Sequence, residues 1–193
     1  MRLAEVERGD TVRSRLLIRF ISLVSRNRLP DAARVAFYHR DFAGGPLASW
    51  TQRAMRGPST WTVGERELMA AMVGTWNSTE FCIGAHRATA TGAMDGGVVD
   101  AAMRDYRSAP ISEQLRSTLT FLEKMTREPD QLTDEDARAV LATGVTRQQL
   151  LDAAAVATVF NVITRYADAL DFTIPSNDEF DAAAKMLLKR GYA

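Results

Sequence analysis

Apolar residues recur every three or four positions along most of the chain, and segments that alternate strictly between polar and apolar residues are nearly absent. A period close to 3.6 residues is typical of amphipathic α-helices. One apolar stripe, within residues 12–24, consists of Leu16, Leu17, Phe20, Ile21 and Val24. A second, within residues 112–127, consists of Leu115, Leu119, Leu122 and Met125. We therefore predict an all-α protein in which residues 12–24 form an amphipathic helix and the stripe within residues 112–127 faces inward.

Capping signals indicate where several helices begin. Three pairs have the composition and spacing of a capping box, namely Thr62 with Glu65, Thr133 with Asp136, and Thr146 with Gln149. The last two predict helices over residues 133–143 and 147–170. Further helices are expected over residues 29–40, 47–55, 98–106 and 177–190. Pro30 fits the first turn of its helix, and residues 44–46, Gly-Gly-Pro, predict a loop.

Length and composition favour one domain. The chain has 193 residues, of which 46% are hydrophobic, enough for a sizeable core. We predict a single all-α domain over residues 1–193, with residues 177–190 as its C-terminal helix.

Charge and hydropathy exclude some partners and favour a location. Twenty-four Lys and Arg residues balance 24 Asp and Glu residues, so no net field attracts nucleic acid or an anionic membrane. The longest apolar stretches, such as residues 150–160, are shorter than the roughly 20 residues that cross a bilayer. The first residues lack the apolar core of a signal peptide. We expect a soluble, cytoplasmic protein that binds neither nucleic acid nor membrane.

The residues best suited to catalysis or binding lie in one segment, residues 62–90. It contains Cys82, the only cysteine, and His86, one of two histidines, four positions later. Glu67 precedes Cys82 by fifteen positions, and the apolar pattern between them predicts two helices joined by a short break. Residues four apart share one face of a helix, so Cys82 and His86 can approach each other. A lone cysteine also excludes an intrachain disulfide.

Two opposing effects act on the pKa of the Cys82 thiol. Residues 77–79, Asn-Ser-Thr, favour a helix N-cap, which puts Cys82 in a first turn where free amides and His86 lower a thiol pKa. Phe81 makes the surroundings apolar and acts in the opposite direction. The sequence leaves open which effect dominates. If Glu67 faces its apolar neighbours, desolvation is expected to raise its pKa and suit it to proton transfer.

The run ERELMAAMVGTWNSTEFCIGAH, residues 65–86, resembles the signature of the alkylhydroperoxidase D-like branch of the carboxymuconolactone decarboxylase family, particularly its peroxidase-related members. That signature is a helix with an acidic residue followed by C-x-x-C-x-x-x-H. In the match, Glu67 takes the place of the relay glutamate, Cys82 that of the second, peroxidatic cysteine, and His86 that of the relay histidine. Thr79 stands where the first cysteine is expected.

The resemblance covers residues 30–170 and includes an Asn-x-x-x-Arg pattern at Asn161 and Arg165. It implies the alkylhydroperoxidase D-like helical fold, a homo-oligomer, and antioxidant, peroxiredoxin-type reduction of a hydroperoxide with no cofactor and no metal. Because Thr79 cannot form the family's disulfide, the implied chemistry uses Cys82 alone as the peroxidatic cysteine, with an external thiol as reductant. The peroxide, or another small molecule, is the implied substrate.

Two other functions remain open. In one, a lyase or isomerase of the carboxymuconolactone decarboxylase kind uses His86 and Glu67 as acid and base. In the other, the protein is a catalytically silent oligomeric binding protein of the same fold. Cys82, His86 and Glu67 supply three metal ligands, whereas closed structural zinc sites take four, so a metal centre is not favoured.

Two further groups of polar residues have structural interpretations. His39 is interpreted as a histidine satisfied by local hydrogen bonds. Asn161, Arg165 and Asp168 form a polar stripe on the helix predicted over residues 147–170. The favoured interpretation is an Arg165–Asp168 ion pair within the helix, and the alternative is a pocket wall or a subunit contact.

Overall fold

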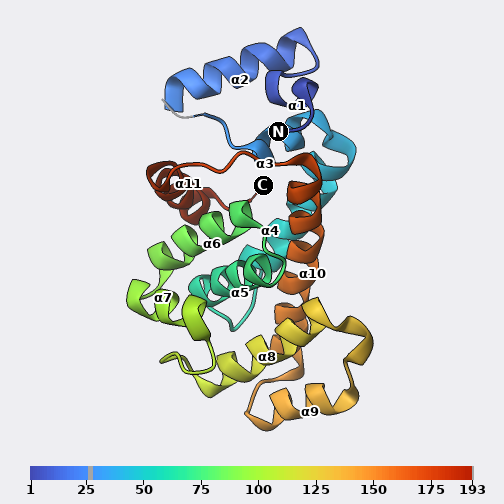
Figure 1. Ribbon diagram of the computed structural model, residues 1–193, viewed down its shortest axis with the longest axis vertical. Helices are drawn as coiled ribbons and strands as arrows, with labels where there is room; N and C mark the ends of the chain where they lie inside the picture. The colour runs from blue at the N-terminus through green and yellow to red at the C-terminus, as the bar shows by residue number, and fades with distance from the viewer. Residues whose placement is uncertain (26–27, 193) are drawn as a thin grey trace.

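The computed structural model describes residues 1–25 and 28–192, and within these ranges the chain forms helices and no strands (Figure 1). The helices are α1 (Ala4–Arg8), α2 (Val12–Ser25), α3 (Asp31–Tyr38), the π-helix η1 (Arg40–Leu47), α4 (Ala48–Arg56), α5 (Val63–Trp76), α6 (Glu80–Ala93), α7 (Gly96–Asp105), α8 (Glu113–Arg127), the 3-10 turn η2 (Pro129–Gln131), α9 (Asp134–Ala142), α10 (Arg147–Leu170) and α11 (Asn177–Arg190). The predicted all-α class is confirmed.

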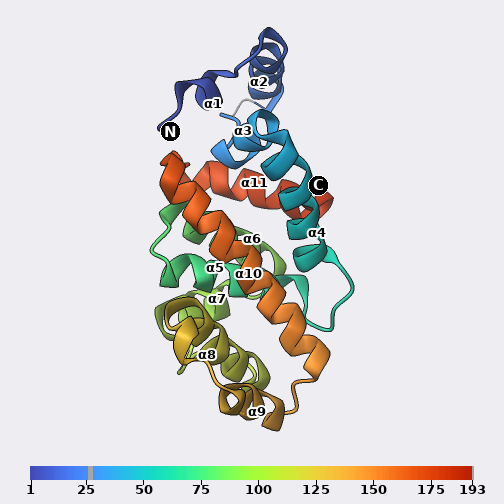
Figure 2. The same cartoon turned by 90° about the vertical axis from the view of Figure 1, so that its right-hand side faces the viewer.

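The antiparallel pair α5–α6 lies at the centre of the fold. Ten of the fourteen residues of α5 are buried. Helices α8 and α10 pack against α5, and α11 packs against α6, so that neighbours enclose the pair (Figures 1 and 2). Small residues permit this close packing: a Cβ on Gly74 of α5 would lie 3.2 Å from the Cβ of Cys82 on α6.

Two apolar clusters form around this pair. The larger one joins α5, α8 and α10 through residues that include Leu68, Met69, Val73, Leu119, Leu122, Val156 and Phe160. The smaller one joins the N-terminal helices to α6, α10 and α11 through Val6, Val35, Ala43, Phe81, Cys82, Ala167, Phe172 and Phe180. Cys82 therefore belongs to an aromatic-rich cluster.

The predicted capping residues begin their helices. At Thr62, Thr133 and Thr146 the backbone N–H donates to the side chain three residues later, at 2.8 Å in each case. The C-terminal helix also spans the predicted residues 177–190. These starts depend on contacts within one turn, which is why the local sequence determines them.

Two predicted details are wrong. Residues 44–46 lie in the π-helix η1, which continues into α4, and do not form a loop. Pro30 is the N-cap of α3 and lies outside its first turn. The predicted amphipathic helix over residues 12–24 is present as α2, but its apolar stripe is largely exposed, with Leu16, Phe20 and Val24 at 61%, 64% and 68%.

Helix α10 is longer than the apolar stretch of residues 150–160 that it contains. Its 24 residues include a window of mean hydropathy 1.2, so by length and composition it could cross a membrane. The core helix of a soluble protein passes the same test. Val156, Val159 and Phe160 of α10 are buried against the other helices, as expected of a core helix.

Candidate active site

The pair α5–α6 brings Glu67, Cys82 and His86 into one region. The capping box at Thr62 begins α5, and Glu67 follows in its second turn. The break is tight, with Ser78 in the left-handed region at φ 58°. Helix α6 begins at Glu80, so Cys82 lies in its first turn, as predicted, and His86 lies one turn further on.

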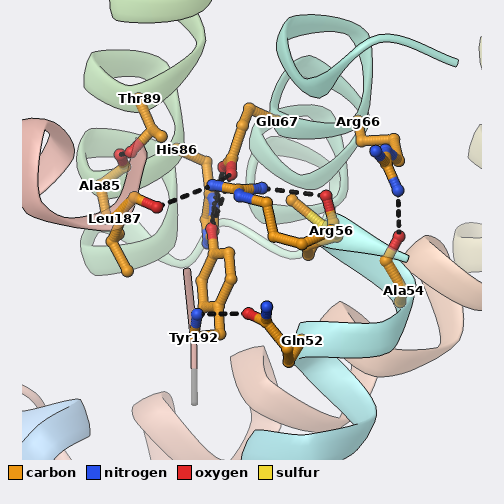
Figure 3. A network of polar contacts seen from close by, with 11 residues as sticks. Gln52, Ala54, Arg56, Arg66, Glu67, Ala85, His86, Thr89, Leu187 and Tyr192 are labelled. Atoms are coloured by element: carbon orange, nitrogen blue, oxygen red, sulfur yellow. Dashed lines mark hydrogen bonds and ion pairs between the residues drawn. The ribbon is translucent and has the colours of Figure 1, made fainter. Parts of the chain in front are cut away.

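Glu67 is fully buried and accepts hydrogen bonds from three side chains (Figure 3). Its Oε2 lies 2.8 Å from Nδ1 of His86, which comes from α6. Its Oε1 accepts from Nη2 of Arg56, at 2.7 Å, at the end of α4. The hydroxyl of Tyr192, beyond α11, donates to both oxygens at 2.9 and 3.0 Å. Four segments of the chain thus converge on one carboxylate.

The pKa of Glu67 is lowered, and the predicted rise is wrong. Burial alone raises this pKa, but the hydrogen bond from His86, the charge of that ring and the Arg56 guanidinium together lower it further than burial raises it. The carboxylate is therefore ionised at neutral pH. An ionised carboxylate at this position can accept a hydrogen bond from His86.

The ionised carboxylate fixes the tautomer of His86. A carboxylate can only accept, so Nδ1 of His86 carries a proton and donates to Glu67. In the neutral ring Nε2 then has a free lone pair, and it makes no hydrogen bond within the described residues. The ring is held edge-on to Phe160, with centroids 4.3 Å apart. This arrangement leaves Nε2 as the ring nitrogen that could accept a proton.

Burial dominates at Cys82. Its side chain is 1% exposed, and the described residues form no hydrogen bond with the thiol. Burial, and next the charge of Asp168, raise the pKa of Cys82 to about 12. The first-turn position and His86 do not overcome these effects. The thiol is therefore protonated at rest, and any reaction as a nucleophile needs a base.

Thr79 connects the start of α6 to α10. Its hydroxyl donates to Oδ2 of Asp168 at 2.7 Å, and it forms no capping bond at the start of α6. Arg165 donates to Oδ1 of Asn77 at 2.9 Å, and Nδ2 of Asn77 donates to Asn161 at the same distance. Within the described residues Arg165 and Asp168 form no ion pair, so that prediction is wrong. The polar stripe of α10 instead holds the α5–α6 break.

Comparison with solved structures identifies the fold. A peroxidase-related protein from Silicibacter sp. TM1040 superposes with a TM-score of 0.76, at 21% identity over 93% of each chain. The alkylhydroperoxidase AhpD core of a peroxidase-related protein from Ralstonia eutropha JMP134 superposes with a TM-score of 0.71, at 22% identity over 91% of this chain and 90% of that one. The chain has the AhpD core fold. The resemblance inferred from the sequence is thereby confirmed for the fold.

A debrominase has a similar structure. A cysteine-to-alanine variant of Bmp8, in complex with 2,3,4-tribromopyrrole, superposes with a TM-score of 0.69, at 16% identity over 94% of this chain and 92% of that one. No protein-family model and no curated protein matches the sequence. Similar structures are therefore found among peroxidase-related proteins and in a debrominase.

Two residues that complete the site in this AhpD core fold were not identified from the sequence. Arg56 lies one position beyond the helix predicted over residues 47–55, and Tyr192 lies in the C-terminal segment. Neither belongs to a motif, since they reach Glu67 from 11 and 125 residues away along the chain. No local signal in the sequence could have identified them.

The remaining candidate residues lie elsewhere in the AhpD core fold. Nδ1 of His39 is 2.7 Å from the hydroxyl of Tyr166, which agrees with a histidine satisfied by local contacts. His39 also lines a surface hollow of about 510 Å³, together with residues 10, 11, 13, 14, 37, 38, 40 and 41, and none of Glu67, Cys82 and His86 lines it. Within residues 1–25 and 28–192, no three His, Cys, Asp or Glu side chains are grouped to hold a metal ion.

Proposed function

We propose that the chain is a thiol-dependent hydroperoxide reductase in which Cys82 is the single peroxidatic cysteine. The observation that carries this proposal is the buried Glu67–His86 contact of 2.8 Å, which supports a role as base for His86, one turn along α6 from Cys82. Side chains four apart on a helix have Cβ atoms about 5–6 Å apart. The AhpD core fold shared with peroxidase-related proteins supports the same function.

In the first step, sulfur attacks the terminal oxygen of the hydroperoxide. As the S–O bond forms and the O–O bond breaks, the thiol proton passes to Nε2 of His86 and then to the departing alkoxide. The products are a sulfenic acid on Cys82 and an alcohol. Glu67 remains ionised and stabilises the imidazolium while it exists.

In the second step, an external thiol reduces the sulfenic acid. Thr79 offers no sulfur, and the chain has no other cysteine, so resolution inside one chain cannot occur. One external thiol displaces water to give a mixed disulfide, and a second releases Cys82 and leaves with the oxidised reductant. A reducing cytoplasm supplies such thiols, so we propose that location and an antioxidant role.

The proposal is tested by intact mass after brief exposure to a stoichiometric organic hydroperoxide with a sulfenic-acid trap. The wild-type protein is expected to gain one trap adduct, and Cys82→Ser none. Thr89→Ser, a buried change one turn beyond His86 on α6, is the matched control and is expected to react like the wild type. A wild-type protein that gains no adduct would contradict the proposal.

A further inference from the structure

The C-terminal segment reaches back into the centre of the fold. After α11 ends, Gly191 adopts φ 78°, and the backbone N–H of Tyr192 donates to Oε1 of Gln52 on α4 at 2.6 Å. A Cβ on Gly191 would lie 2.3 Å from that same oxygen. The turn therefore needs glycine, both for its dihedral angle and for the close approach of Gln52.

This turn places Tyr192 beside Glu67, His86 and Arg56, which together form the charged cluster. Its hydroxyl donates to both oxygens of Glu67, its ring is nearly parallel to that of His86 at 6.3 Å, and the Arg56 guanidinium lies 5.0 Å from its centroid (Figure 3). Burial and next the Glu67 charge raise the pKa of Tyr192 well above its usual value. The phenol is therefore always a donor toward the carboxylate.

We propose that Tyr192 is a positioning residue, which keeps Glu67 ionised and thereby keeps the Nδ1 proton on His86. A buried carboxylate that loses one donor binds a proton more readily. Glu67 would then be protonated at a higher pH, and a protonated carboxyl no longer holds the ring with Nε2 free. This inference deepens the proposed function and rests on it for its catalytic consequence, whereas the effect on Glu67 is independent of activity.

The direct test is a carbon-13 NMR titration of the Glu67 carboxyl in protein labelled at glutamate, with Glu67→Gln to assign the signal. In Tyr192→Phe the acid dissociation constant of Glu67 is expected to fall about two- to tenfold, the usual contribution of one neutral hydrogen bond. An unchanged titration of Glu67 would overturn the proposal.

Tyr106 provides a matched control. Like that of Tyr192, its hydroxyl donates to a partly buried carboxylate, that of Glu123, at 2.7 Å. The guanidinium of Arg107 also lies over its ring, at 4.6 Å from the centroid. In Tyr106→Phe the Glu67 titration is expected to stay as in the wild type. An equal effect of both substitutions on Glu67 would mean a general loss of structure, and would overturn a specific role for Tyr192.

A second variant displaces the phenol without removing it. In Gly191→Ala the added Cβ meets Gln52, and the left-handed dihedral is strained, so Tyr192 should leave the cluster. The Glu67 titration is expected to move in the same direction as in Tyr192→Phe. A Glu67 titration that stays as in the wild type would contradict the proposed role of the segment.

Measurements of enzyme activity separate this inference from the proposed function. In Tyr192→Phe the acid limb of kcat/KM for hydroperoxide is expected to move to higher pH, with KM nearly unchanged. If the wild type reduces no hydroperoxide, the proposed function fails while the NMR result still decides the role of Tyr192. If the wild type is active and the acid limb is unmoved, the positioning role in catalysis is overturned.

Discussion

Glu67 and Cys82 are both buried, and burial raises the pKa of each, but the neighbouring groups shift the two pKa values in opposite directions. Glu67 has three donors, two of them cationic or able to become so, and its pKa is lowered. Cys82 has no hydrogen-bond partner among the described residues and the negative charge of Asp168 near it, and its pKa is raised. The thiol proton must therefore move for the proposed reaction to begin.

Substitution of Glu67 by glutamine tests the charge of the cluster. Because Arg56 would keep a buried charge without its partner, Glu67→Gln is expected to lower the free energy of unfolding by about 3 kcal/mol at pH 7. Urea unfolding measures this change. Glu65→Gln, at the start of the same helix, is the control and is expected to cost less than about 1 kcal/mol.

The same variants give a pH dependence of stability. A carboxyl whose pKa is lowered on folding stabilises the protein above its unfolded pKa of about 4.3, and that contribution is lost as pH falls through the folded pKa. The free energy of unfolding should therefore fall less between pH 5 and pH 3, about one unit either side of that value, in Glu67→Gln than in the wild type. An equally steep fall in both would contradict an ionised Glu67.

Alkylation by iodoacetamide tests the state of Cys82. With a pKa of about 12, the thiolate fraction rises tenfold for each pH unit throughout the neutral and mildly alkaline range. The alkylation rate of the folded protein should rise in the same way, without a plateau. The unfolded protein is the control, and its rate should level off above about pH 8.5. A plateau near neutral pH in the folded protein would mean that the thiol is already activated.

At the scale of the elements, features that depend on residues within one helical turn could be predicted from the sequence better than contacts between distant segments. The starts of α5, α9 and α10 could be predicted because a cap and its partner lie within one turn. The separation of Cys82 and His86 by one helical turn followed from the same regularity. The contacts of Arg56 and Tyr192 with Glu67 could not be predicted, because they arise only when α4 and the C-terminal segment pack beside α5 and α6.

The break between α5 and α6 is where the chain departs from the two-cysteine pattern. Thr79 and Cys82 are the N-cap and third residue of α6, a separation that brings two Cα atoms within the range of a disulfide. Thr79→Cys is therefore expected to resolve the sulfenic acid within one chain and to raise peroxide turnover with a dithiol reductant. Thr79→Ser, which keeps the hydrogen bond to Asp168, is the control. No gain in the cysteine variant would mean that resolution is not what limits turnover.

At the scale of the whole molecule, α2 lies at one end (Figures 1 and 2). Its residues Leu16, Phe20 and Val24 expose apolar side chains to solvent. The predicted homo-oligomer would bury such a face in a contact between copies, because exposed apolar area is unfavourable in water. The amphipathic pattern was interpreted correctly as a helix, but a pattern alone does not distinguish a core face from an interface.

Light scattering after size exclusion tests this prediction. The wild type is expected to have the mass of an oligomer, and the double variant Leu16→Glu with Phe20→Glu that of one chain. Leu151→Glu is the control, since Leu151 is 63% exposed on α10, away from α2, and should leave the mass unchanged. A wild-type protein with the mass of one chain would contradict the predicted oligomer.

The most direct test of the central claim is the rate of Cys82 oxidation by an organic hydroperoxide, measured by rapid mixing in the wild type and in His86→Ala. If His86 takes the thiol proton, its loss should slow oxidation by a factor of about 100 or more, the usual contribution of a general base. Equal rates in the two proteins would contradict the account, because the thiol would then react without the base that Glu67 holds in place.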